Sequence, residues 1–231
     1  MVADIYSRSG LQNYDVSKLF GFVRGYELSE VSTARSYLQP LMLRYGFDAV
    51  ERDGSLVFIS RSGAHPITLT GDTLVMSPEV DGVIEYKRGS HIETAGRVRL
   101  NFIESDHDYD VITEETVLSD DRTHCVATSA MPLVMTRPEA RGVVDKWLSE
   151  ARIAQETARF VLPPSMLGVA PGDIVRFTNR PDAKRYRVDM IEHDRAQVVE
   201  AVRIELEVYR PALYPAEQTN IQSSPGLIPV F

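Results

Sequence analysis

Three aspartates alternate along one short acidic segment and could bind a divalent cation. Asp106, Asp108 and Asp110 occupy every second position after Glu104, and carboxylate oxygens are ligands that Ca²⁺ prefers. An EF-hand loop also needs a glycine at its sharp turn and a closing bidentate glutamate, and both are missing here. We therefore interpret the segment as a solvated acidic loop, with an irregular Ca²⁺ site as the alternative.

The histidines and the single cysteine show neither a metal-site spacing nor an activated nucleophile. No two histidines are four residues apart, the spacing that puts two ligands on one helix face. The five are His65, His91, His107, His124 and His193. His124 and Cys125 are adjacent, and neighbours on a strand face opposite sides, so they form no dyad by themselves. The simplest expectation for Cys125 is a small buried apolar residue.

Other catalytic motifs are missing from the sequence. It contains no G-x-S-x-G around a serine, no G-x-G-x-x-G and no G-x-x-x-x-G-K-[ST]. The 33 acidic residues could include a glycosidase-like pair, but only a fold could bring two of them together. The sequence therefore predicts no catalytic residue, no cofactor-binding residue, no cofactor and no metal ligand. We expect a protein that is not an enzyme.

Composition restricts the classes of partner. The 231 residues are 43% hydrophobic and 25% charged, with a formal net charge of -8, which suits one large folded domain or two small ones. Proteins that grip nucleic acid usually present basic patches, whereas the arginines here are scattered among acidic residues. Phosphates are repelled by such a surface, so DNA could pass it without sticking. No apolar stretch approaches the ~18 residues that span a bilayer.

The first residues resemble the end of a helix. Ala3–Ser9 fits a short helix that stops at Gly10, a residue that accepts the left-handed conformation after a helix. Because a natural domain rarely opens on the last turns of a helix, we expect Met1 to begin a piece of a longer protein.

A helix and a hairpin are expected next. Phe22–Leu28 alternates as a strand would, and Ser32 is a fair N-cap for the apolar stripe of Ala34–Tyr45. Pro40 inside that stripe predicts a kink or a tight first half. Two apolar runs flank Asp53-Gly54, which is a strong hairpin signal because both residues accept positive φ.

From Val83 onward the pattern changes to short strands around one further helix. Arg97–Ile103 alternates most clearly. The helix covers about residues 137 to 156, with Thr136 as its cap and Trp147 as a core anchor. Tyr186–Ile191 and Val198–Tyr209 are expected to form a long antiparallel pair.

These elements predict a mainly β, α+β fold with two helices, built from small barrel- or sandwich-type subdomains. We expect a small α+β unit with a helix and a hairpin in residues 1–80. A β-rich, barrel-like unit with one helix should follow in residues 81–209. Residues 210–231 contain four prolines and no periodicity, so we interpret them as an extended linker or arm.

An ordered set of motifs adds a family resemblance. The motifs are Asp15–Ser17, Val23–Tyr26, Thr33–Leu41, Tyr45–Val50, Asp108-Tyr109, Trp147-Leu148, Phe160–Ser165, Pro171–Val175 and Val202–Glu205. In this order and spacing, over roughly residues 1 to 210, the chain resembles the hub portion of a large tail-tip protein. That protein occurs in gene transfer agents and related long-tailed phages and is often called the baseplate megatron.

The resemblance implies a structural role in a virion or phage-like particle tail, made in the bacterial cytoplasm. It implies small β-barrel and α+β hub subdomains, three copies of which close a ring. That ring continues the tail tube and joins it to the tail tip. Expected partners are further copies in a homotrimer, distal tail and other baseplate proteins, and translocating DNA without sequence-specific binding. The family supplies no catalytic residue here, and no (β/α)₈ pattern of its glycosidase-related region is present.

Two surfaces are candidates for contact between copies. One is the Val198–Tyr209 strand; the other is the arm, which can bind a neighbour by strand addition. The apolar residues of the arm are Leu213, Tyr214, Ile221, Leu227, Ile228 and Phe231. The alternative function is a carbohydrate- or peptidoglycan-binding β module on the tail tip. It predicts a groove lined by exposed aromatics such as Tyr86, Tyr109, Phe177 and Tyr186.

Overall fold

The computed structural model describes residues 1–62, 65–90, 95–106, 108–118, 125–178, 184–193 and 196–209. Its α-helices are α1 (Val2–Arg8), α2 (Ala34–Tyr45) and α3 (Arg137–Ile153). Its strands are β1 (Tyr14–Asp15), β2 (Phe47–Arg52), β3 (Ser55–Ser60), β4 (Ile67–Leu69), β5 (Ile84–Arg88), β6 (Arg97–Glu104), β7 (Val111–Val117), β8 (Val126–Met135), β9 (Glu156–Leu162), β10 (Ile174–Phe177), β11 (Arg185–His193) and β12 (Gln197–Ile204). Three short 3-10 helices are η1 (Gly71–Thr73), η2 (Pro164–Met166) and η3 (Leu206–Tyr209).

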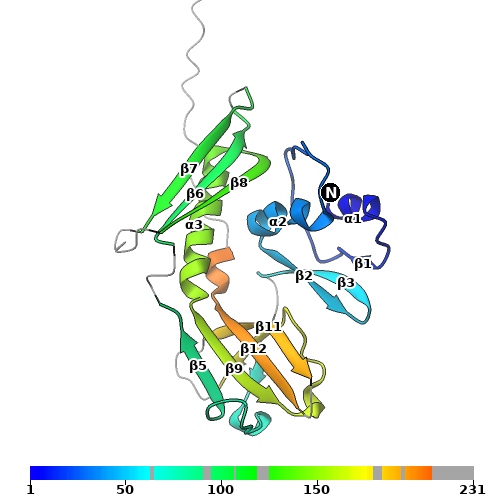
Figure 1. The fold of residues 1–231 in the computed structure, drawn as a ribbon, viewed down its shortest axis with the longest axis vertical. Coiled ribbons are helices and arrows are strands. Elements are labelled where there is room, and N and C mark those ends of the chain that lie inside the picture. The colour runs from blue at the N-terminus through cyan, green and yellow to red at the C-terminus, as the bar shows by residue number, and fades with distance from the viewer. Residues whose placement is uncertain are drawn as a thin grey trace, which may run out of the picture.

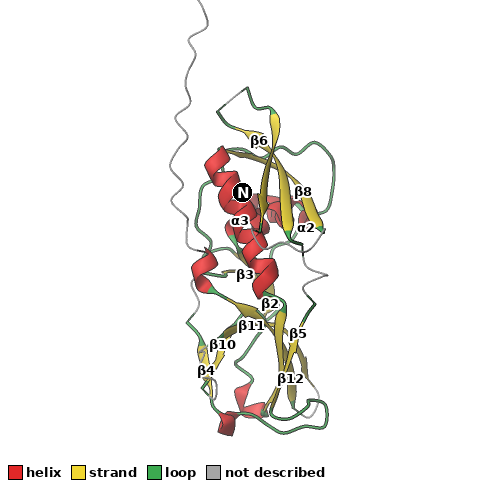
Figure 2. Cartoon of the chain, turned by 90° about the vertical axis from the view of Figure 1, so that its left-hand side faces the viewer, coloured by secondary structure: helices red, strands yellow, loops and turns green. Residues whose placement is uncertain are grey.

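The elements are arranged in two lobes (Figures 1 and 2). The upper lobe holds the three α-helices and two three-stranded sheets, ordered β1-β3-β2 and β7-β6-β8. The lower lobe is a six-stranded sheet, β4-β10-β11-β12-β9-β5. This sheet curls into a half-barrel, so Tyr86 on edge strand β5 reaches Phe177 on β10, with 6.3 Å between ring centroids.

Each lobe has its own hydrophobic core. The upper core includes Phe58 and Phe102, and the lower core includes Leu69, Phe160 and Tyr186, all fully buried. The chain passes between the lobes several times, so segments before and after residue 80 contribute to both cores. The division into units at residue 80 stays a prediction, and the arm of residues 210–231 lies outside the described residues.

The mainly β class is correct, but the helix count and the barrel are only approximate. The described residues contain three α-helices rather than two, and the lower sheet is a half-barrel rather than a closed one. α3 ends at Ile153, earlier than expected, because Glu156 already begins β9. η3 likewise replaces the last part of the expected Val198–Tyr209 strand.

Local signals place most turns and caps correctly. Asp53 and Gly54 adopt φ of 50° and 71° at the predicted hairpin, as a two-residue turn between twisted strands requires. Pro40 lies inside α2, as expected. The cap of α2 is Thr33 rather than Ser32, because the Thr33 side chain accepts the hydrogen bond from the Ser36 N–H. Phe22–Leu28 forms no strand; only Tyr26 makes an isolated bridge, to Leu133.

Candidate functional site

The metal and nucleophile candidates that the structure describes do not come together in one site. Among the described residues, no group of three or more His, Cys, Asp or Glu side chains could hold a metal ion. Asp106, Asp108 and Asp110 are exposed around the turn after β6. His91, His107 and His124 lie outside the described residues, so the Ca²⁺ alternative stays a prediction. Cys125 is exposed rather than buried, because it precedes β8 instead of packing into a core.

Of the two surfaces expected to bind other copies, the Val198–Tyr209 strand is not available as predicted. β12 is not an edge strand, because it lies between β11 and β9 in the middle of the six-stranded sheet. A hydrogen-bonded central strand has no free backbone groups to offer a neighbour. The arm is not among the described residues. In the part of the chain that the structure describes, no helix is long and apolar enough to cross a membrane.

The aromatic groove of the carbohydrate-binding alternative is not formed by its predicted residues. Phe177 and Tyr186 are buried in the lower core, and Tyr86 packs against both of them. Only Tyr109 is exposed, at 67%. These residues alternate along strands whose inner face is the core, and a sequence pattern does not distinguish a core aromatic from a ligand platform.

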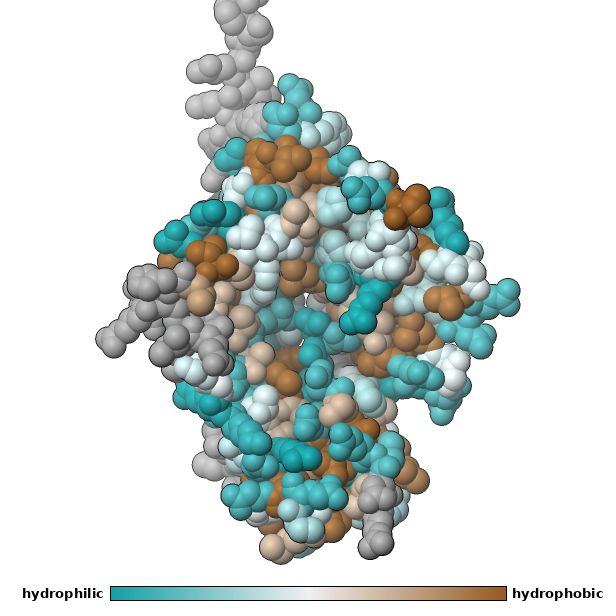
Figure 3. Space-filling view, in the orientation of Figure 1, coloured by the Kyte–Doolittle hydropathy of each residue, from teal (hydrophilic) through white to brown (hydrophobic). Residues whose placement is uncertain are grey.

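The most conspicuous surface feature is an apolar loop between β1 and α2. This apolar loop, residues 16–33, has no regular element and exposes four large hydrophobic side chains. They are Phe20 at 86%, Phe22 at 74%, Leu28 at 51% and Val31 at 106%. Figure 3 shows apolar groups projecting from the part of the surface around α1 and α2. Long irregular loops in compact domains are commonly functional, and clustered exposed apolar groups mark interaction sites.

Three tyrosine hydroxyls connect the apolar loop to α2, two of them by binding carbonyls of the loop and one by binding a carbonyl of the helix. The Tyr45 hydroxyl donates to the Phe22 carbonyl at 2.6 Å, and the Tyr37 hydroxyl donates to the Glu30 carbonyl. The Tyr26 hydroxyl donates to the Tyr37 carbonyl at 2.7 Å. Burial is the main cause that raises the pKa of Tyr26 and Tyr45, so both remain neutral donors at physiological pH.

The loop is also tied to β8 by two backbone hydrogen bonds and to α3 by Arg24, which donates to Glu139 at 3.2 Å. The Glu27 N–H donates to the Pro132 carbonyl, and the Val134 N–H donates to the Gly25 carbonyl, both at 2.9 Å. A Cβ at Gly25 would lie 2.7 Å from Val134, so only glycine allows this approach. The phenylalanines therefore point outward from a fixed backbone, and such preorganisation lowers the entropic cost of binding a partner.

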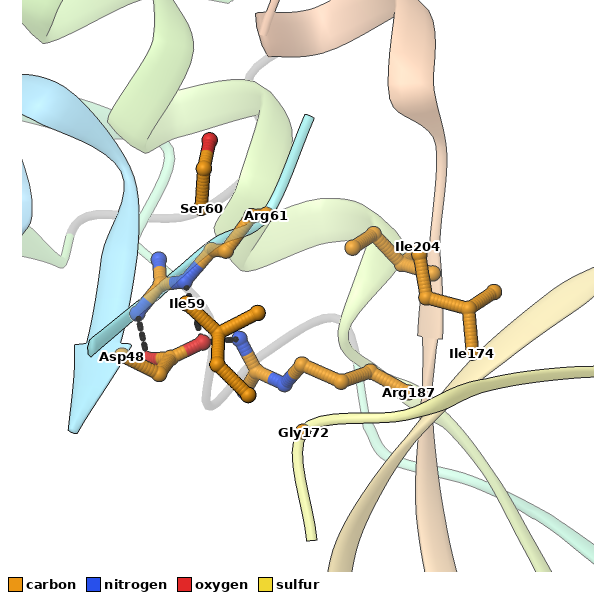
Figure 4. A pocket seen from close by; sticks show the side chains of 8 residues that line it. All are labelled: Asp48, Ile59, Ser60, Arg61, Gly172, Ile174, Arg187 and Ile204. Carbon is orange, nitrogen blue, oxygen red and sulfur yellow. Dashed lines mark hydrogen bonds and ion pairs between the residues drawn. The ribbon is translucent and has the colours of Figure 1, made fainter. Parts of the chain in front are cut away.

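A second feature is the ionic junction between the lobes (Figure 4). The Asp48 carboxylate on β2 accepts hydrogen bonds from Arg61 at 2.6 and 2.8 Å and from Arg187 of β11 at 2.9 Å. Arg61 also donates to Glu150 of α3 at 3.0 Å. Although burial alone would lower the pKa of Arg61, the two carboxylates raise it. A second cross-lobe pair joins Arg52 to Asp173 at 2.7 Å.

A cavity of about 270 Å³ lies beside this junction, between α3, β12 and η3. Trp147 packs against the upper core, as expected, and also lines the cavity with Val202 and Tyr209. Nearby, the Lys146 Nζ donates to the Arg44 carbonyl at 2.7 Å, and burial lowers the pKa of Lys146 to about 8. These groups are held by hydrogen bonds and ion pairs that join neighbouring elements.

The comparison that decides the family covers most of the chain. A family model described as putative phage tail protein matches residues 33–191. The chain belongs to this phage tail protein family. It is a structural protein of a phage-like tail, so the virion tail is its location.

Solved structures agree with this phage tail assignment. A chain in the virion of a native gene transfer agent particle is 42% identical, with a TM-score of 0.88 over 94% of this chain. This chain covers 49% of that one, so it spans about half the length of its relative. No curated protein matches the sequence.

Two tail proteins of known structure share the fold at low identity. The 43 kDa tail protein of prophage MuSo2 from Shewanella oneidensis is 15% identical, with a TM-score of 0.54. The match covers 90% of this chain and 66% of that protein. A tail protein from Neisseria meningitidis MC58 is 14% identical, with a TM-score of 0.54. The match covers 93% of this chain and 68% of that protein. At such identities the likeness concerns the fold alone.

Proposed function

We propose that this tail protein forms part of the hub at the baseplate of a phage-like particle. Three copies would close a ring that continues the tail tube and joins it to the tail tip. The chain would be the hub portion of a baseplate megatron. Its neighbours would be distal tail proteins, other baseplate proteins, and translocating DNA that passes without sequence-specific contact. We also propose that the chain has no catalytic activity of its own.

The observation that carries the proposal is the apolar loop together with the particle relative. Phe20 and Phe22 are held outward by a fixed backbone, which is unfavourable for an isolated soluble chain and favourable for one that is covered by a neighbour. The close relative is itself part of an assembled virion. An assembly role accounts for both facts.

The net charge of -8 supports passage rather than capture of DNA. Affinity for duplex DNA depends mainly on neutralising phosphates with Lys and Arg. Here many arginines already face carboxylates, such as Arg97 and Arg99 with Glu115 at 3.3 and 2.7 Å. Such pairs leave little free positive charge for phosphates.

The test is the position and copy number of the protein in purified particles. Antibody labelling should mark the distal end of the tail, and quantitative mass spectrometry against the capsid protein should give three copies per particle. Particles made without the protein should lack a joined tail tip. Labelling along the whole tail, or one copy per particle, would contradict a hub ring.

A further inference from the structure

The joint between the lobes combines ion pairs with an open pocket of mostly apolar lining. No described residue belongs to both main hydrophobic cores, and the 270 Å³ cavity lies between α3 of the upper lobe and β12 of the lower lobe. This pocket is open to solvent, so the lobes make fewer dispersion contacts across it than the side chains of a packed core make with one another. The angle between the lobes can therefore change at a lower free-energy cost than the packing within either lobe.

On one side of the joint, the backbone crosses between the lobes at two adjacent places. α3 passes into β9 through Ala154 and Gln155, and β12 passes into η3 through Glu205. Ala154 and Glu205 line the same cavity, so the two crossings lie side by side. Short connections at the ends of elements are where hinges absorb changes in φ and ψ.

On the other side, the β2–β3 hairpin meets the lower lobe through ion pairs. Arg187 of β11 donates to Asp48 of β2 at 2.9 Å. Arg52 at the end of β2 donates to Asp173 at 2.7 Å and to the Pro171 carbonyl at 3.1 Å. The four charged side chains are 20–27% exposed, so dissolved salt can reach them.

Both carboxylates keep a partner inside their own lobe. Asp48 is also held by Arg61, which lies just after β3 in the upper lobe. Asp173 also accepts a hydrogen bond from the Ala170 N–H, at 2.9 Å, in the lower lobe. Breaking the cross-lobe pairs therefore leaves neither carboxylate without a donor, which removes the largest penalty for breaking a partly buried ion pair.

We propose that the joint is a hinge with an ionic latch. The lobes open about the two adjacent crossings when the Asp48–Arg187 and Arg52–Asp173 pairs break. Opening leaves each hydrophobic core intact and gives the chain a second shape. This inference concerns the single chain and goes beyond the proposed place in a hub ring, because it holds for a chain of any oligomeric state.

The test measures one distance across the joint and one within a lobe. In a Cys125→Ser background, spin labels are attached to Glu51→Cys on β2 and Met190→Cys on β11; Met190 is 43% exposed. The control pair is Glu51→Cys with Leu11→Cys, both in the upper lobe. Raising the salt from a low concentration to about 1 M should add a longer cross-lobe distance while the control distance stays constant.

A latch variant and a matched control separate the latch from general charge effects. Arg52→Gln with Arg187→Gln removes the two cross-lobe pairs and should raise the open population about tenfold at low salt. Arg97→Gln with Arg99→Gln removes the same charge from pairs inside the upper sheet and should leave the distance unchanged.

Each other outcome overturns the proposal. A cross-lobe distance that stays constant in high salt excludes the hinge, and this result needs no folded latch variant. A salt effect that a folded latch variant does not reproduce, or that the control variant also produces, assigns opening to other charges and excludes the latch.

Discussion

Glu104 is 3% exposed at the end of β6, and its carboxylate accepts a hydrogen bond from the Arg137 Nε at 2.6 Å. Arg137 is the first residue of α3, so this contact fixes the start of the helix that covers β6 and β7. Burying a carboxylate is costly unless it is hydrogen-bonded, and here the arginine satisfies it.

Removing this contact should destabilise the upper lobe. Arg137→Ala leaves the Glu104 carboxylate buried with one donor fewer, and we expect a loss of about 2 kcal/mol in the free energy of unfolding. Urea denaturation measures it. The matched control is Arg99→Ala, which removes a surface partner of Glu115 and should cost about 0.5 kcal/mol. Equal losses in both variants would contradict a special role for the buried pair.

Loss of the capping box of α3 should lower the unfolding free energy by a smaller amount. The Thr136 hydroxyl accepts from the Glu139 N–H at 3.3 Å, and the Glu139 carboxylate accepts from the Thr136 N–H at 2.9 Å. Thr136→Ala should lower the unfolding free energy by about 1 kcal/mol, because a helix-terminal N–H loses its acceptor. Thr136→Ser retains the hydroxyl and should be nearly neutral. Thermal melts of the two variants that coincide would refute the cap.

Glu156 predicts a pH dependence of the lower lobe. Burial alone would raise its pKa, but hydrogen bonds from Lys184 and Tyr186 and the charge of Arg203 lower it from 4.5 to about 2. Because the folded pKa is below the unfolded one, this stabilisation is fully present above pH 4.5 and is lost as the pH falls towards 2.

Two glutamate-to-glutamine variants test this role of Glu156 through the pH dependence of their melting temperatures. Glu156→Gln should flatten the fall of the melting temperature between pH 4.5 and 2, because the titrating group has been removed. Glu200→Gln changes the same charge on a side chain that is 49% exposed and should keep the wild-type slope. An unchanged slope in Glu156→Gln would assign acid sensitivity to other carboxylates.

A substitution at Gly46 tests how tightly η3 packs against the upper lobe. It ends α2 with φ of 66°, and a Cβ there would lie 2.9 Å from the Tyr209 ring. Gly46→Ala therefore adds a clash to the strain of a left-handed residue. Gly54→Ala has the same strain at φ of 71° with nothing within 4 Å. We expect Gly46→Ala to cost about 1 kcal/mol more than Gly54→Ala in urea denaturation. Equal costs would mean that Tyr209 moves aside freely.

The contrast between these sites explains which features the sequence could predict. The Asp53-Gly54 hairpin and the Thr136 cap depend on residues next to one another, so their types indicate the structure directly. The Asp48–Arg187 contact joins residues 139 positions apart, and the parallel pairing of β4 with β10 joins residues 108 positions apart. No local pattern encodes such pairings, so neither the ionic junction nor the central place of β12 could be predicted.

The apolar loop was missed for a related reason. Its alternating residues, Phe22 to Leu28, resemble a strand with one buried face, and β propensity reflects a fit to a pleated surface. In the structure the loop backbone is bound by two tyrosine hydroxyls of α2 and by two backbone hydrogen bonds to β8, and not by a continuous strand pairing. Gly21 just before this stretch and Gly25 inside it are the signal that could have indicated an irregular segment.

The last prediction separates assembly from folding. Phe20→Ser with Phe22→Ser should leave the melting temperature of the chain unchanged, because both side chains are mostly exposed. The same variant should fail to enter particles, since the apolar contact with a neighbour is lost. Met76→Ser is the control: Met76 is 76% exposed, lies in the lower lobe, and its substitution should leave assembly unchanged. Quantifying each variant in purified particles and in the cell lysate measures the effect. Normal incorporation of the double variant would show that the apolar loop is not an assembly surface.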